Sequence, residues 1–182
     1  KPKDEHATCC KNESGWEQNI QEAARMKSAV LVMNLFRQCL DNFISYAQLK
    51  GIEISWTYSC GEELCVLVFP LFLETVFINL VDNAIKYTLP EGNIKVRIDS
   101  SEENIFLRVI DDGVGIPEEK RPVLFNRFAG IGSKHGKNEH SVGLGLYVVN
   151  EICKLNGLEL EYAENSEAVS GSIFTVIFKR LG

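Results

Sequence analysis

The residues with the clearest chemical potential are two glycine clusters and a stripe of polar side chains. The first cluster is Asp111-Asp112-Gly113-Val114-Gly115-Ile116, and the second, thirty residues further on, is Gly143-Leu144-Gly145-Leu146. The stripe comprises Asn79, Asn83 and Lys86, whose spacings of four and three residues place them on one helix face. We expect these segments to form a pocket that holds a purine at one end and a magnesium-bound polyphosphate at the other.

The polar stripe belongs to a predicted helix, 71–88, that is otherwise almost wholly apolar. Pro70 suits the first turn of this helix, and a Leu-Pro-Glu-Gly turn signal follows it at 89–92. A helix that is apolar nearly all round is buried, and each buried polar group without a partner costs about 1–3 kcal/mol. Magnesium, which takes oxygen ligands, together with phosphate would satisfy the stripe. Alternatively, the asparagines bond to each other or to the backbone, and the helix alone does not decide.

Asp111 directly follows a predicted strand, 105–110. The glycines at 113 and 115 would let the backbone turn tightly and approach a flat ligand. The carboxylate could accept a hydrogen bond from the exocyclic amine of a base. By itself the cluster is equally compatible with a loop in which Asp and Gly serve turn geometry alone.

The second glycine cluster opens a predicted helix, 141–155, whose free N-terminal amides would bind an anion. Neither G-x-G-x-x-G nor G-x-x-x-x-G-K occurs, which argues against Rossmann and P-loop sites. Between the two clusters, segment 120–140 is basic and punctuated by glycines, and it indicates a mobile lid over the polyphosphate. A solvated loop is the alternative. The charged residues of this segment are Lys120, Arg121, Arg127, Lys134 and Lys137, against the single acid Glu139.

The pattern of elements predicts an α+β fold. Hairpins of alternating strands mixed with helices favour a two-layer α/β sandwich, in which helices pack on one face of a mixed, mostly antiparallel sheet. It does not resemble a doubly wound parallel sheet. We expect residues 1–27 to be a linker or helical remnant and 28–182 to be one domain. The other predicted elements are a helix at 29–49, a short helical stretch near 118–125, and strands at 52–58, 64–69, 93–100, 158–163 and 172–179.

Bulk composition excludes several classes of protein. The chain has 182 residues and a formal net charge of −6, which argues against a nucleic-acid partner. Its six cysteines include no C-x-x-C pair and no Cys/His cluster with zinc spacing. The longest apolar run, 64–73, is about half the length that a membrane-spanning helix needs and contains Pro70. We therefore expect this chain not to span a membrane.

Taken in order, four motifs resemble those of the ATP-binding catalytic domain (HATPase_c) of sensor histidine kinases. Segment 79–88 is similar to the N box, 111–116 to the first glycine box, 124–128 to the F box and 143–146 to the second glycine box. That kinase domain is a member of the GHKL superfamily, which also includes DNA gyrase B, MutL and the Hsp90 chaperones. The resemblance implies the two-layer Bergerat fold for residues 30 to 180.

The resemblance also implies roles for individual residues. Asn83 would coordinate Mg²⁺, Asp111 would bind the adenine amine of ATP, and Arg127 would stabilise the transferring phosphoryl group. The implied catalytic residues are Asn79, Lys86 and Arg127. The implied cofactor-binding residues are Asn79, Asn83, Lys86, Tyr87, Asp111, Gly113, Gly115, Ile116, Phe125, Ser141, Gly143, Leu144, Gly145 and Leu146.

By the same likeness, the domain would be a protein-histidine kinase of a two-component system. It would transfer the γ-phosphoryl group of ATP to a histidine on a separate dimerisation domain of the same protein, and a response regulator receiver domain would be the further partner. The phosphoacceptor motif His-Glu-x-x-x-Pro is absent from this chain. We expect a cytoplasmic location, as the cytoplasmic part of a membrane-anchored sensor.

Some residues depart from the relatives. Asn79 stands where hydrolytic relatives carry a glutamate, and an amide cannot act as the base that activates water. This favours phosphoryl transfer over hydrolysis. Ser141 replaces a glycine, and Ala129 and Gly130 replace a Tyr-Arg pair. Two alternatives stay open: a GHKL-type ATPase, and a degenerate module that binds ATP or a partner without turnover.

Overall fold

The structure is a computed structural model that describes residues 28–59, 65–68, 70–128 and 143–180. Strands and helices alternate along the chain in short groups. The order of elements is β1 (Ser28–Leu31), α2 (Val32–Leu49), β2 (Glu53–Tyr58), β3 (Cys65–Val68), α3 (Pro70–Tyr87), β4 (Asn93–Ser100), β5 (Asn104–Asp111), the 3₁₀ helix η1 (Glu118–Val123), α4 (Gly145–Asn156), β6 (Glu159–Glu164) and β7 (Ser172–Lys179).

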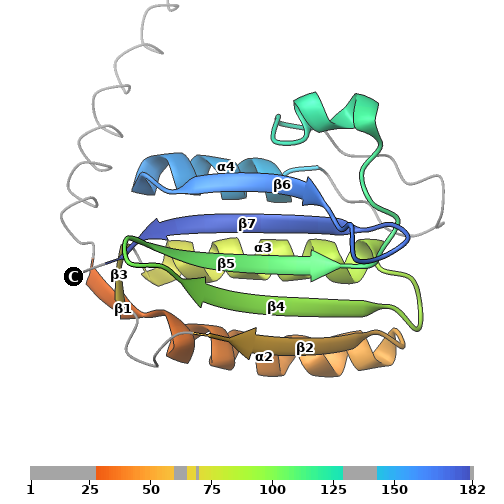
Figure 1. The fold of residues 1–182 in the computed structure, drawn as a ribbon, viewed down its shortest axis with the longest axis horizontal. Coiled ribbons are helices and arrows are strands. Elements are labelled where there is room, and N and C mark those ends of the chain that lie inside the picture. Colours follow the sequence, from red (N-terminus) through yellow and green to blue (C-terminus); the bar gives the residue numbers. More distant parts are fainter. Residues whose placement is uncertain (1–27, 60–64, 69, 129–142, 181–182) are drawn as a thin grey trace, which may run out of the picture.

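Five strands form one sheet in the order β2-β4-β5-β7-β6 (Figure 1). β2 runs parallel to β4, whereas the pairs β4–β5, β5–β7 and β7–β6 are antiparallel. β1 and β3 form a separate antiparallel pair. The predicted sheet, mixed and mostly antiparallel, is confirmed.

The core lies between this sheet and a layer of helices. Every second residue of β4 and β5 is buried, for example Val96 on β4 and Leu107 on β5. Helix α3 contributes the fully buried Phe77 and Leu80 to the same core. Helices α2, α3 and α4 all lie behind the sheet in Figure 1. The two-layer sandwich with helices on one face is therefore confirmed.

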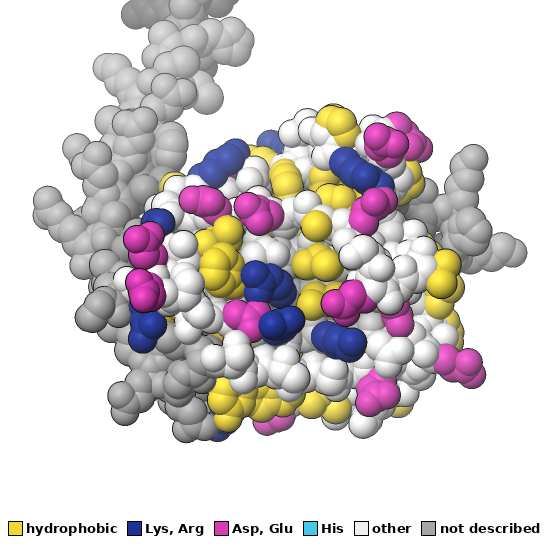
Figure 2. All heavy atoms as spheres, viewed as in Figure 1, with side chains coloured by type: hydrophobic (Ala, Val, Ile, Leu, Met, Phe, Trp, Pro, Cys, Tyr) yellow, Lys and Arg dark blue, Asp and Glu magenta, His cyan; other side chains and the backbone are white. Residues whose placement is uncertain are grey.

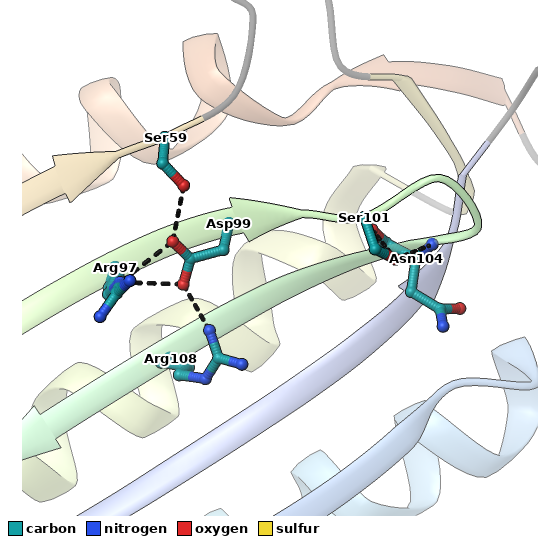
Figure 3. Close-up of polar contacts among 6 residues, drawn as sticks. All are labelled: Ser59, Arg97, Asp99, Ser101, Asn104 and Arg108. Carbon is teal, nitrogen blue, oxygen red and sulfur yellow. Dashed lines mark hydrogen bonds and ion pairs between the residues drawn. The ribbon is translucent and has the colours of Figure 1, made fainter.

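The opposite face of the sheet carries charged side chains. Figure 2 shows Lys and Arg side chains gathered near the middle of this face. On β4, Lys95 and Arg97 are exposed. Asp99 accepts hydrogen bonds from Ser59 Oγ (2.7 Å), Arg97 and Arg108 (Figure 3). Burial alone would raise the pKa of Asp99, but the Ser59 bond and the two guanidinium groups hold it below its ordinary value. This network ties β4 and β5 to the end of β2.

Two predicted element boundaries differ from the structure by three residues or more. The prediction that the first helix begins at Ala29 is wrong, because Ser28–Leu31 forms β1 and pairs with β3 in the register Val30↔Val66. Long-range pairing thus prevails over the helical spacing of the apolar residues. Helix α4 begins at Gly145 rather than Ser141, since Gly143 has a positive φ of 68° and Leu144 is the N-cap.

Within the described ranges, no helix is both long enough and apolar enough to cross a bilayer.

Candidate functional site

The predicted polar stripe lies on α3. Asn79, Asn83 and Lys86 are all half-buried, so the stripe is more exposed than the apolar pattern suggested. Asn79 Nδ2 donates to the Thr75 carbonyl oxygen at 2.8 Å, one turn earlier. Lys86 Nζ forms an ion pair with Asp82 Oδ2 at 2.5 Å. Of the alternatives that the sequence left open, Asn79 therefore takes a backbone partner. Its Oδ1 is the acceptor atom of the same side chain.

Two polar atoms at this helix lack a partner among the described residues. They are Asn83 Nδ2 and Thr88 Oγ1, both of which are buried. Thr88 directly follows α3 and is only 6% exposed. Because a buried polar group without a hydrogen bond is unfavourable, these atoms mark a place where a polar ligand or water would be stabilised.

Asp111 is the last residue of β5, paired with Ser172 on β7, and is 4% exposed. Its Oδ1 accepts hydrogen bonds from the backbone N–H of Gly113 (3.0 Å) and of Ser172 (3.2 Å). Burial raises the pKa of this carboxyl to about 6; the two backbone bonds oppose that shift, and the nearby charge of Asp112 adds to it. Among the described residues, these hydrogen bonds engage Oδ1 and not Oδ2.

The first glycine cluster touches the end of α3. A Cβ atom added at Gly113 would lie 2.3 Å from the carbonyl oxygen of Tyr87, so only glycine fits. Val114 N–H also donates to that oxygen at 3.1 Å. Gly115 has a φ of 68°, and Ile116 packs half-buried against the core. The loop that follows Asp111 is thus fixed to α3 at Tyr87.

The second glycine cluster touches the middle of α3. A Cβ atom added at Gly145 would lie 2.9 Å from Asn79 Oδ1 and 3.7 Å from Asn83 Nδ2. Gly145 begins α4, and the N-cap residue Leu144 provides no side-chain hydrogen bond to the first turn. The free amides of this helix end therefore lie next to the polar stripe, as an anion site requires. Leu146, in the first turn, packs against the core.

The structure brings together most of the predicted site residues, but it does not unite all of them. In the F-box segment, Phe125 packs half-buried against the core, whereas Arg127 is exposed and its guanidinium lies 4.9 Å from the centre of the Phe128 ring. No contact within the described ranges joins Arg127 to the stripe on α3. Ser141 and the remainder of the predicted lid, 129–142, lie outside the described residues.

The loop between β6 and β7 supplies contacts that the sequence analysis missed. Asn165 Nδ2 donates to the Asp111 carbonyl oxygen at 2.9 Å, and Ser170 Oγ donates to the Gly113 carbonyl oxygen at 2.7 Å. A Cβ at Gly171 would lie 2.1 Å from the Asp111 carbonyl oxygen. The only signal in the sequence is a polar, glycine-containing hairpin loop, which does not reveal its long-range partners.

Comparison with known proteins identifies the family. Residues 69–181 match the family described as "Histidine kinase-, DNA gyrase B-, and HSP90-like ATPase". This chain belongs to that family. The match covers α3, both glycine clusters and the strands that position them, so the histidine kinase-like ATPase domain contains every element of the candidate site.

Named relatives agree with this membership. The domain is 33% identical over 118 residues to the signal transduction histidine-protein kinase ArlS of Staphylococcus aureus, a match that covers 65% of this chain and 26% of ArlS. The chain thus spans about a quarter of the length of the curated relatives it matches. It is a histidine kinase-like ATPase domain homologous to sensor histidine kinases.

Solved structures share the fold at lower sequence identity. The mycobacterial sensor histidine kinase MprB superposes with a TM-score of 0.71 at 22% identity, covering 85% of this chain and 97% of that one. The catalytic domain of histidine kinase ThkA gives 0.71 at 23% identity, with 84% and 97% covered. Full-length ShkA in complex with AMPPNP gives 0.70 at 24% identity, with 86% and 32% covered. These likenesses establish the fold of the ATPase domain.

Proposed function

We propose that this domain binds Mg-ATP between its two glycine clusters and transfers the γ-phosphoryl group to a histidine on a separate domain. The observation that carries the proposal is the contact of both clusters with one helix: Gly113 with Tyr87, and Gly145 with Asn79 and Asn83. Segments distant in sequence thereby lie against the same helix, which supports a shared site. The related kinase ShkA has been solved with AMPPNP, a non-hydrolysable ATP analogue, which supports a nucleotide as the ligand.

Asp111 suits the adenine end of this site. Its Oδ1 is occupied by two backbone donors, so Oδ2 would accept a hydrogen bond from the exocyclic amine. Gly113 and Gly115 leave the backbone bare of side chains beside it, which lets a flat base approach. Ile116 would provide apolar contact at the same end, and Phe125 would support it from the F-box segment.

The polar stripe suits the phosphate end. Asn83 Nδ2 has no hydrogen-bond partner among the described residues, so it could donate to a phosphate oxygen. The amide oxygen of the same side chain is of the type that Mg²⁺ takes, so the residue fits a metal ligand. Asn79, Lys86 and Tyr87 would surround the phosphates, and the free amides at Gly143, Leu144, Gly145 and Leu146 would bind their oxygens. By the resemblance, Ser141, which lies outside the described residues, would also bind the nucleotide. Magnesium, when bound, would neutralise charge that develops on the phosphate oxygens.

Transfer, rather than hydrolysis, follows from the groups available. Asn79 contributes an amide whose nitrogen already donates to Thr75, and it holds no base that could activate water. Phosphoryl transfer relies mainly on positioning and on electrostatic stabilisation, which Lys86 and Arg127 would supply as cations. For Arg127 this requires a nucleotide-bound arrangement in which its guanidinium reaches the γ-phosphate.

The partners follow from the kind of protein to which the relatives belong. ArlS is named a signal transduction histidine-protein kinase, and this chain matches only about a quarter of it. The acceptor would therefore be a histidine on a dimerisation domain of the same protein, and a response regulator receiver domain would take the phosphoryl group next. A cytoplasmic site would give the domain access to ATP.

A phosphotransfer assay tests this function. The domain is mixed with γ-labelled ATP, magnesium and the histidine-bearing domain of the same protein. The expected result is an acid-labile, alkali-stable label on the histidine domain and little label on the ATPase domain itself. Rapid release of free phosphate without a labelled histidine would instead identify an ATPase, and neither label nor release would identify a module without turnover.

A further inference from the structure

Arg121, in η1, contacts two parts of the chain: the end of the first glycine cluster and strand β6. Its Nε donates to the Ile116 carbonyl oxygen at 3.1 Å, at the end of the first glycine cluster. The terminal nitrogen NH2 of the same guanidinium forms an ion pair with Glu164 on β6. The guanidinium carbon also lies 5.9 Å from the centre of the Tyr162 ring. One planar side chain thus bridges the glycine loop and the edge strand of the sheet.

The residue next to Glu164 holds the other end of the same loop. Asn165 Nδ2 donates to the Asp111 carbonyl oxygen, where the loop begins, and Glu164 reaches Ile116 through Arg121, where the loop ends. Adjacent residues at the end of β6 therefore fix both ends of segment 111–116.

We propose that Arg121 is a positioning residue for the adenine end of the nucleotide site. This inference rests on the proposed function, because Arg121 can affect a ligand in this way only if segment 111–116 binds the base. Arg121 is not among the residues that we expect to contact the nucleotide. It acts through the Ile116 carbonyl, by holding the loop after Asp111 in the conformation that the base meets.

The chemistry of arginine suits this bridging role. The guanidinium presents several donors in a rigid plane, so it can donate to a carbonyl and pair with a carboxylate at once. The ion pair is partly exposed, with 31% of the Arg121 side chain and 64% of the Glu164 side chain accessible. An exposed pair of this kind adds little to global stability. The ion pair instead holds one loop in a fixed conformation. This preorganisation affects ligand affinity more than the free energy of unfolding.

The test compares Arg121→Ala with the unaltered protein. We expect the affinity for Mg-AMPPNP to fall about three- to tenfold, the range for losing one hydrogen bond and one exposed ion pair. Amide hydrogen exchange in the nucleotide-free protein should become faster in segment 112–117 and stay unchanged in α3. The urea midpoint of unfolding should not move.

Arg97→Ala is the matched control, because Arg97 also pairs with a carboxylate, Asp99, but on the charged face of the sheet (Figure 3). It should leave nucleotide affinity unchanged. Equal affinity of Arg121→Ala and the unaltered protein would overturn the inference, as would a loss that accompanies a lower urea midpoint or that Arg97→Ala reproduces. If the unaltered protein itself binds no Mg-AMPPNP, the proposed function fails, and this inference fails with it.

Discussion

At the scale of single residues, the Asp111 carboxylate has a structural role in the fold and a proposed role in ligand binding. Its Oδ1 closes the junction between β5, the glycine loop and β7 through the amides of Gly113 and Ser172. In the proposed function, its Oδ2 would accept the hydrogen bond from the ligand. A conservative change can therefore separate the two roles, because an asparagine keeps one oxygen acceptor and replaces the other oxygen with a donor.

Asp111→Asn should lower the affinity for Mg-AMPPNP. The new amide nitrogen and the adenine amine would both be hydrogen-bond donors, so they could not bond to each other. Losing a charge-assisted hydrogen bond of about 1.5–3 kcal/mol corresponds to a dissociation constant that is roughly ten- to hundredfold larger. Titration calorimetry measures this directly. Asp112→Asn, which removes the same charge from the neighbouring residue, serves as the control and should stay within about twofold. Unaltered binding by Asp111→Asn would refute the adenine assignment.

The same carboxyl predicts a pH dependence of stability. Burial raises the pKa of Asp111 to about 6 in the folded protein, so the folded state holds a proton that the unfolded state has already released. The contribution of Asp111 is therefore greatest at low pH and falls as pH rises towards the folded pKa. Between about pH 4.5 and pH 7 this loss should be about 2 kcal/mol.

Urea unfolding of the unaltered protein and of Asp111→Asn at both pH values isolates this effect, since the other titrating groups are common to both. The difference in unfolding free energy between the two proteins should shift in favour of Asp111→Asn at the higher pH. A difference that is independent of pH would mean that the Asp111 carboxyl is not desolvated in the folded state.

At the scale of elements, α3 is the support on which both glycine clusters rest, but the two contacts differ in kind. Gly113 meets the backbone of Tyr87, which cannot move aside, whereas Gly145 meets the end of the Asn79 side chain, which can. A methyl group at each position should therefore have a different outcome.

Gly113→Ala should destabilise the domain by about 1–3 kcal/mol, as expected for overpacking against a fixed neighbour. Gly145→Ala should leave the free energy of unfolding nearly unchanged but weaken Mg-AMPPNP binding, because the displaced Asn79 amide and the new methyl group intrude on the phosphate end. Urea unfolding and calorimetry on both variants check the contrast. Similar unfolding losses for the two would contradict this account of the contacts.

Much of this arrangement could be predicted from the sequence, because it depends on patterns among residues close together in the chain. The stripe on α3, the alternation in β4 and β5 and the glycine that ends α4 follow from periodicity and turn chemistry, and the structure confirms them. The hydrogen bonds of Asn165 and Ser170 could not be predicted, because their partners, Asp111 and Gly113, are more than fifty residues away. β1 was missed for the same reason, since only its pairing with β3 makes it a strand.

At the scale of the whole molecule, the site exists only when the sheet and the helix layer are assembled. Asp111 comes from β5, the stripe from α3 and the proposed anion-binding turn from the start of α4, and these meet only through packing against one core. The family match from 69 to 181 spans all three elements. A ligand that touches each of them should therefore stabilise the folded domain as a unit.

Mg-AMPPNP should raise the melting temperature accordingly. At a free concentration of about 100 times its dissociation constant, a ligand that binds only the folded state adds about 2.7 kcal/mol, which for a domain of this size corresponds to roughly 5–10 °C. Differential scanning calorimetry measures the shift, and Asp111→Asn should reduce it by about half or more at the same nucleotide concentration. A shift of equal size in both proteins would place the nucleotide elsewhere.

The most direct test of the central claim is a crystal structure of this domain with AMPPNP and magnesium. The account predicts one nucleotide between the two glycine clusters, with its adenine amine on Asp111 Oδ2, the metal on the Asn83 amide oxygen and the phosphates at the N-terminus of α4. A nucleotide bound away from Asp111 and Asn83, or with its base and phosphate ends exchanged, would contradict it.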